Sequence, residues 1–134
     1  MGVFCSQRRS TNKGWYWFVD TRTNKVLLGF TDTGGNDELN YLAQQTGNGQ
    51  RLQSITSATG TLNGYLNGAQ QETGVTSTST WETTPGTPNF NLGALASQSV
   101  YYEVYVQEVV IYESNESSNR SAIETNINGH YSIY

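Results

Sequence analysis

The pair Asn67-Gly68 constrains this chain more than any other feature of its sequence. Both central residues of a two-residue type I′ turn need a positive φ, and Asn-Gly is the preferred pair for that turn. Apolar residues precede the pair and a polar run follows it. The pattern therefore predicts a β-hairpin in the middle of the chain, and the earlier pair Asn63-Gly64 predicts a bulge within its first strand.

Further strands are expected on both sides of this hairpin, because aromatic and β-branched runs alternate with Gly, Asn and Thr turns. Composition agrees with a folded β domain, since 12% of the residues are aromatic and only 13% are charged. The expected strands are residues 14–20, 25–30, 39–42, 50–55, 61–66 with a polar partner after the turn, 90–94 and 101–113, the last being the longest.

One helix is expected over about residues 115–128. Ser114 is a suitable N-cap, Glu116 would lie in the first turn, where the helix dipole favours an acid, and Gly129 is a natural stop. A narrow apolar stripe repeats every four residues and predicts that this helix lies on the surface of the β domain; it is formed by Ile123, Ile127 and Tyr131 with Ala122 beside them.

The length of 134 residues indicates one domain, residues 1–134. Two sheets are needed to bury so many alternating strands, so the predicted class is all-β, an antiparallel two-sheet sandwich with one short C-terminal helix. Residues 73–89 are rich in Thr, Ser, Gly and Pro and are expected to form a long loop. Trp81 is the one bulky apolar residue of that loop.

Several protein classes are excluded by simple features. No run approaches the roughly 18 apolar residues that a transmembrane helix needs. The basic pair Arg8-Arg9 follows the short apolar stretch at the N-terminus, which is the wrong order for a signal peptide. Cys5 is the only cysteine and His130 the only histidine, so an internal disulfide and a Cys- or His-rich metal site are both excluded. An unpaired cysteine fits a reducing compartment.

Charge is distributed unevenly along the chain. Residues 1–51 carry a net charge of +2, whereas residues 52–134 carry −6. Arg8, Arg9 and Lys13 near Trp15 could form a platform for single-stranded nucleic acid. A solvated turn between strands is the simpler interpretation, because a chain with a pI near 4.8 is poorly suited to phosphate backbones, and no nucleic-acid partner is expected. A basic end and an acidic end can instead meet head-to-tail in an assembly.

Catalysis is not predicted. In the expected strand 101–113, Glu103 and Glu113 would stand about 33 Å apart at roughly 3.3 Å per residue, and Glu108 would face the other side. Glu108 would share its face with valines and could be a buried, paired carboxylate. A dyad of Cys5 and His130 has no supporting motif, and a small buried hydrophobe is the simpler interpretation of the cysteine.

The best metal candidate is a calcium site, and no other cofactor is expected. Asp32, Asn36, Asp37 and Glu38 place hard oxygen ligands around one turn, which is the chemistry that Ca²⁺ prefers. Their spacing matches no known calcium loop, and acidic turns are common.

Four segments occur in an order that resembles a known family. They are residues 62–69 (LNGYLNGA), residues 90–94 (FNLGA), residues 105–112 (YVQEVVIY) and the capped helix. Their order is similar to the second half of a concanavalin A-like (laminin-G-like) jelly roll. The tail from residue 107 to residue 134 resembles versions of that domain carried by tailed-phage virion proteins. The resemblance implies a jelly-roll fold and a place in a virion made in the host cytoplasm.

The chain departs from this family at its start, because it begins almost directly on what resembles an internal strand. A sheet without its first strand has an open edge that must be covered or paired. We therefore expect a non-enzymatic virion structural protein, either a capsid decoration or cement protein or a tail or fibre component. It would dock onto other virion proteins in an oligomeric assembly, with no membrane partner.

The expected contact residues are Arg8, Arg9, Trp15 and Trp81, because Trp and Arg are enriched among interface anchors. At least one of Trp15 and Trp17 should belong to the core. The alternative function is carbohydrate binding, for instance of host surface glycans, since exposed aromatics framed by Asn and Asp also suit sugars. The family's sugar and calcium sites lie in variable loops, and none of them maps onto particular residues of this chain.

Overall fold

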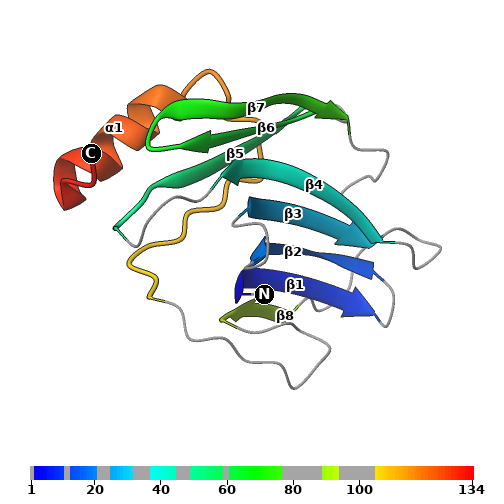
Figure 1. Ribbon diagram of the computed structural model, residues 1–134. Helices are drawn as coiled ribbons and strands as arrows, with labels where there is room; N and C mark the ends of the chain where they lie inside the picture. The colour runs from blue at the N-terminus through cyan, green and yellow to red at the C-terminus, as the bar shows by residue number, and fades with distance from the viewer. Residues whose placement is uncertain are drawn as a thin grey trace.

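A computed structural model of the chain contains strands and one C-terminal helix (Figure 1). It describes residues 2–10, 13–20, 25–31, 37–44, 49–58, 61–76, 89–93 and 105–134. Every strand pairing among these residues is antiparallel. The predicted class, mainly antiparallel β-structure with a helix at the C-terminal end, is confirmed.

The larger sheet has five strands in the order β4-β3-β2-β1-β8. Strands β1 to β4 follow one another as neighbours, and β8 joins the sheet beside β1, with Cys5 opposite Leu92. The strands are β1 (Gly2–Ser10), β2 (Lys13–Asp20), β3 (Lys25–Thr31), β4 (Asp37–Gln44) and β8 (Asn89–Leu92).

The smaller sheet has three strands in the order β5-β6-β7. They are β5 (Gln53–Ala58), β6 (Thr61–Leu66) and β7 (Ala69–Thr76). Strand β4 of the larger sheet contacts both β6 and β7. In Figure 1 the small sheet lies at the top beside the helix, and β8 lies at the bottom of the large sheet.

The turn between β6 and β7 is the predicted hairpin. Asn67 has a φ of 50° and Gly68 a φ of 77°, and Leu66 pairs with Ala69 directly across the turn. The register of the β6–β7 pair shifts on both sides of Gly64, but the extra residues lie in β7, so the bulge predicted within β6 is wrong in its strand. Both positive φ values belong to residues that adopt them at low cost, which explains why this short segment turns here.

The turn is tied to the chain that enters β5. The backbone N–H of Asn67 donates to the carbonyl oxygen of Leu52 at 2.8 Å, and the N–H of Leu52 donates to Asn67 Oδ1 at 3.0 Å. Because Asn67 satisfies two backbone groups of Leu52, the entry to β5 is held in register with the hairpin.

Among the side chains whose burial is described, both sheets contribute to the core. Val26 of β3 and Leu62 of β6 are almost completely buried. In β6 Leu62 and Gly64 are buried while their neighbours are half-buried, which is the period of two expected for a strand with one inner face. The hairpin therefore packs on the core through this inner face of β6.

Three strand predictions need correction. Residues 105–113 form no strand, although the strand 101–113 was predicted to be the longest; residues 101–104 lie outside the described part. The predicted loop 73–89 is wrong at its start, because β7 continues to Thr76. Residues 2–10 form strand β1, which was not among the expected strands, and Arg8 and Arg9 lie in this strand and not in the expected turn. The pairing of β1 with β8 joins residues more than 80 positions apart, which local patterns do not report.

Helix α1 (Arg120–Tyr131) begins later than predicted. Its N-cap residue is Asn119, and Ser114 and Glu116 belong instead to a turn before the helix. The Ser117 N–H donates to Asn115 Oδ1 at 3.1 Å, so this turn is held by its own side-chain bonds. Ser and Asn form such local bonds as readily as they cap helices, which explains the later start.

The helix also continues past Gly129, the predicted stop, and ends at Ser132 with a left-handed φ of 53°. Asn128 accounts for this later end. Its Oδ1 accepts hydrogen bonds from the N–H groups of Ile133 at 2.8 Å and Tyr134 at 2.9 Å, and its Nδ2 donates to the Tyr134 carbonyl at 2.7 Å. Within the described residues, no helix is both long and apolar enough to cross a membrane.

Substitutions at two glycines should change the free energy of unfolding in opposite directions, and so test the assigned turn and helix end. Gly68→Ala should lower the free energy of unfolding by about 1 kcal/mol, because an L-residue is strained at this positive φ. The added Cβ would also lie 3.1 Å from the Tyr134 hydroxyl oxygen.

Gly129→Ala should raise the free energy of unfolding by roughly 0.5–1 kcal/mol, because Gly129 lies inside the helix and a Cβ meets nothing within 4 Å.

Urea titration followed by circular dichroism measures both changes. Equal effects of the two substitutions would contradict the assigned turn and helix end.

Candidate interaction surface

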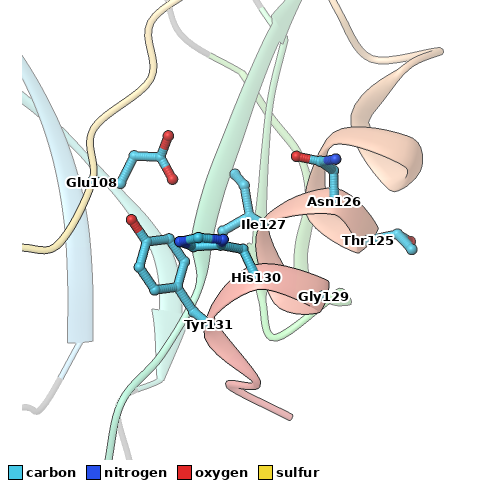
Figure 2. Close-up of a pocket in the computed structure, with 7 residues that line it drawn as sticks. All are labelled: Glu108, Thr125, Asn126, Ile127, Gly129, His130 and Tyr131. Atoms are coloured by element: carbon cyan, nitrogen blue, oxygen red, sulfur yellow. The ribbon is translucent and has the colours of Figure 1, made fainter.

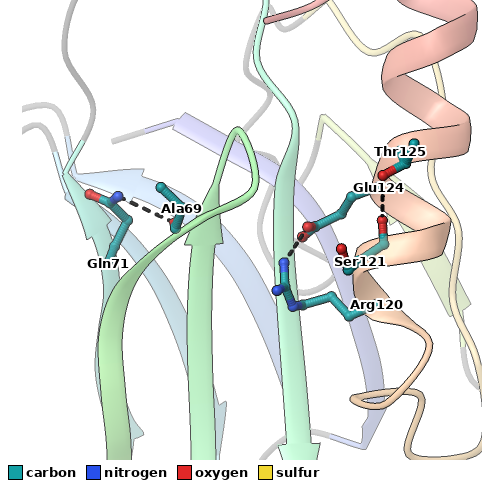
Figure 3. A network of polar contacts seen from close by, with 6 residues as sticks. All are labelled: Ala69, Gln71, Arg120, Ser121, Glu124 and Thr125. Carbon is teal, nitrogen blue, oxygen red and sulfur yellow. Dashed lines mark hydrogen bonds and ion pairs between the residues drawn. The ribbon is translucent and has the colours of Figure 1, made fainter.

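Helix α1 contacts the small sheet through one cluster of charged side chains. The guanidinium of Arg120 lies 3.8 Å from the centre of the Tyr65 ring on β6, a cation–π contact. Arg120 also forms an ion pair with Glu124 one turn along the helix (Figure 3). Glu124 is only 4% exposed, so its carboxylate depends on Arg120 for compensation of its charge.

The C-terminal residues close over the hairpin turn. The Tyr134 side chain lies against Gly68, with its hydroxyl oxygen at the position nearest to where a Cβ would stand. Burial raises the pKa of the Tyr134 phenol, the negative charge of Glu124 adds to the rise, and the positive charge of Arg120 opposes it. The predicted apolar stripe is confirmed in that Ile123, Ile127 and Tyr131 are half-buried, whereas Ala122 is exposed.

The most unusual surface is formed by residues 105–112, here called the 105–112 segment. Tyr105 is 93% exposed, Ile111 58% and Tyr112 51%, and the segment belongs to no strand of either sheet. Tyr105 and Tyr112 alone expose on the order of 300 Å². This area is comparable to the largest apolar patch of a typical monomeric protein, and such patches often mark interaction sites. The other exposed large apolar side chains of the segment are Val106, Val109 and Val110.

A pocket of about 580 Å³ lies between the 105–112 segment and the last turns of α1. Glu108 faces Tyr131 and His130 across it (Figure 2). The His130 and Tyr131 rings meet edge to face, with centroids 4.6 Å apart. The pocket is lined by Glu108, Thr125, Asn126, Ile127, Gly129, His130 and Tyr131.

Glu108 is exposed, which corrects the prediction of a buried, paired carboxylate. That prediction assumed strand alternation, and residues 105–113 are not a strand. The neighbouring Gln107 is fixed by a hydrogen bond from Gln50 Nε2 to its Oε1 at 2.5 Å. The segment is therefore attached to the chain just before β5 through a side chain.

The turn before α1 is held by Glu116. Its carboxylate accepts hydrogen bonds from Ser114 Oγ at 2.5 Å and from Asn119 Nδ2 at 2.7 Å, and the Asn119 N–H donates to its carbonyl at 2.9 Å. The bond from Ser114, and then that from Asn119, hold the pKa of Glu116 below its usual value of 4.5. This carboxylate therefore fixes the residue at which the helix begins.

Three of the four predicted contact residues lie in strands of the large sheet. Arg8 and Arg9 lie in β1, and Trp15 lies in β2 opposite Gln7 and Phe30; the side chains of these three predicted residues are not among those described. Trp81 lies outside the described residues altogether. Trp17 is half-buried.

The calcium candidate lies mostly outside the described part of the chain. Asp32 and Asn36 are not described, and Asp37 and Glu38 are the first two residues of β4. Among the residues whose placement is described, no group of three or more His, Cys, Asp or Glu side chains could hold a metal ion.

Sequence reasoning missed the 105–112 segment as a surface because its composition is that of a buried strand. The available signal was its acid content: Glu108 interrupts an otherwise apolar run, and Glu113 follows it. Comparison of the chain with protein-family models, with curated proteins and with solved structures found no match. The functional argument therefore depends on the chain's own residues.

Removing the positive charge of Arg120 tests whether the buried Glu124 depends on it. Arg120→Ala should lower the free energy of unfolding by about 2 kcal/mol, because the buried Glu124 would lose its ion-pair partner; partial exposure of Arg120 limits the loss. Ser121→Ala, the next residue on the helix, should change it by less than about 0.5 kcal/mol.

Replacing both charges, with Arg120→Met and Glu124→Leu, should restore most of the stability. Arg120→Ala and Ser121→Ala variants with equal denaturation midpoints would show that Glu124 does not need this partner.

Acidification should release the turn before the helix. The pKa of Glu116 is lowered on folding, so the turn's contribution to stability is present above about pH 4.5 and is lost as the pH falls through the lowered value. An NMR titration of the Glu116 carboxyl carbon measures that value. In the Ser114→Ala variant the pKa of Glu116 should rise toward 4.5, whereas in the Ser117→Ala control this pKa should not change. If the Ser114→Ala substitution leaves the titration midpoint of Glu116 unchanged, the assigned hydrogen bond from Ser114 to Glu116 is contradicted.

Proposed function

We propose that this chain is a structural subunit that acts by protein–protein contact and catalyses no reaction. The observation that carries the proposal is the 105–112 segment, an apolar run exposed on the surface. Val109 to Tyr112 are four consecutive apolar residues, and leaving them in water costs free energy that a partner surface would recover. The polar Thr- and Asn-rich remainder of the chain keeps such a subunit soluble before it docks.

The proposed setting of this subunit is a virion. The order of residues 62–69, 90–94 and 105–112 and the helix resembles a concanavalin A-like jelly roll, and the tail from residue 107 to residue 134 resembles versions of it in tailed-phage virion proteins, which supports the proposal by analogy. In this proposal the two sheets are the halves of a jelly-roll sandwich. The protein decorates or cements a capsid or forms part of a tail or fibre. Arg8, Arg9, Trp15 and Trp81 supply further contacts to neighbouring virion proteins.

Particle fractionation tests this function. Particles from cells that produce the protein with its natural virion should contain it at a fixed ratio to the main coat or tail subunit, measured by quantitative mass spectrometry across a density gradient. Ile111→Lys should reduce that ratio at least tenfold, because it places a charge in the apolar contact. Ser121→Lys, an equal charge change on exposed helix surface away from the pocket, should leave the ratio unchanged. A protein that stays wholly in the soluble fraction would contradict the proposal.

A second candidate function is glycan binding at the pocket beside α1. The observation that favours it is the combination of the aromatic rings of Tyr131 and His130 with the polar groups of Asn126 and Glu108 around one opening. Sugar sites commonly combine a stacking ring with amide and carboxylate acceptors. On a glycan array, saturable binding lost in Tyr131→Ala would support this pocket, and loss in Trp81→Ala alone would place the glycan site in the loop instead.

A further inference from the structure

We infer that the 105–112 segment is a donor strand that extends the five-stranded sheet of a second copy of this chain along the outer edge of β8. The inference rests on the proposed function and names the partner and the two surfaces that meet. The juxtaposition that carries it is a strand-like segment outside both sheets and an edge strand, β8, whose outer side pairs with no strand in the described part of the chain (Figure 1).

The donor has the sequence of a strand without a place in either sheet. Val109, Val110, Ile111 and Tyr112 are residue types enriched in strands, and all four side chains are exposed. The segment carries backbone donors and acceptors along its length as well as apolar side chains. An extended segment of this kind binds by adding a strand to a sheet edge, where the backbone supplies affinity and the side chains supply specificity.

The acceptor is identified by comparing the sheet edges. β4 and β7, which lie at the edges of the two sheets, contact each other. The chain entering β5 is already linked to Gln107 of the same copy through Gln50. β8 pairs with β1 on one side, and no described strand pairs with its other side. Leu92 of β8 is 52% exposed, so an apolar side chain is available there.

Geometry favours β8 of a second copy over β8 of the same copy. Gln107 is bonded to Gln50, and Glu108 lines the pocket beside α1, so the segment is held near the small sheet and the helix. β8 lies at the far edge of the large sheet (Figure 1). The four residues of β8 also match in length the four-residue apolar run from Val109 to Tyr112.

Charge favours this head-to-tail contact over pairing of two 105–112 segments. The 105–112 segment contains Glu108 and is followed by Glu113, whereas β1, the neighbour of β8, contains Arg8 and Arg9. A donor beside β8 would lie two strand spacings from β1, about 10 Å, which is near the screening length at physiological salt. Segment-to-segment pairing would instead bring two copies of Glu108 and Glu113 together.

The contact joins two different surfaces, so a dimer still has one unused donor on one copy and one unused acceptor on the other. Such a heterologous interface generates a ring when its rotation closes and an open filament when it does not. Association should therefore continue beyond the dimer as concentration rises, which a two-fold contact between identical segments would not do.

Sedimentation velocity of the purified full chain tests the inference. The wild type should show a weight-average mass that rises with concentration above the 14.8 kDa of one chain. Ile111→Pro removes a ladder N–H from the donor, Ile111→Lys charges it, and Leu92→Lys blocks the acceptor edge. Each should be a monomer at all concentrations. Ser121→Lys adds the same charge on exposed helix surface and should associate as the wild type does.

Mixing the variants gives the decisive result. Ile111→Lys protein retains a working acceptor and Leu92→Lys protein a working donor, so their mixture should form a capped dimer of one copy each and nothing larger. Circular dichroism confirms that each variant is folded; Ile111→Pro replaces Ile111→Lys if that variant unfolds.

A monomeric wild type would overturn the inference, as would a Leu92→Lys variant that associates alone or a mixture that stays monomeric. If the monomer still copurifies with particles at a fixed ratio, only the self-association fails and the proposed structural role stands. If it associates head-to-tail but is absent from particles, the donor strand stands and the virion role fails.

Discussion

The type I′ turn at Asn67-Gly68 is the junction on which the small sheet and the C-terminal residues depend. Its asparagine binds both backbone groups of Leu52 and so sets the entry of β5 beside the hairpin. Its glycine has no Cβ and leaves room for the Tyr134 ring. Three segments from residues 52, 67 and 134 therefore meet at one turn, and two backbone angles of unusual sign position them.

The helix adds a second attachment to the same sheet and thereby determines what is left outside. Arg120 contacts the Tyr65 ring on β6 and balances the buried Glu124, while Asn128 folds the last residues back toward the turn. These contacts hold α1 over the small sheet. The 105–112 segment runs beside the helix, joined to the rest of the protein through Gln107 and the pocket around Glu108. Its exposed apolar side chains follow from this arrangement.

Sequence patterns predicted those parts of the fold that depend on interactions between residues close together in the chain. The Asn-Gly turn and the stripe of Ile123, Ile127 and Tyr131 each need only a few neighbouring residues, and both are present. The helix start was wrong because Ser114 can bond to Glu116 as readily as it can cap a helix.

Long-range pairing explains the remaining differences. Strand-forming residues at 105–112 report a preference for extended structure, but the partner of a strand is decided by residues far away in the chain or in another molecule. The same holds for β1, whose pairing with β8 links residues more than 80 positions apart. The candidate surface was therefore present in the sequence as a strand signal, and only the absence of this segment from both sheets identifies it as exposed.

Together these features describe a subunit with an exposed apolar segment outside both sheets and an edge strand, β8, whose outer side pairs with no strand among the described residues. Hydrogen–deuterium exchange at two protein concentrations tests this account most directly. The account predicts that amides of Val109 to Tyr112 exchange rapidly in dilute solution and become protected together with those of β8 as the concentration rises. Amides in the 105–112 segment that exchange equally fast at both concentrations, or that are already protected in dilute solution, would contradict it.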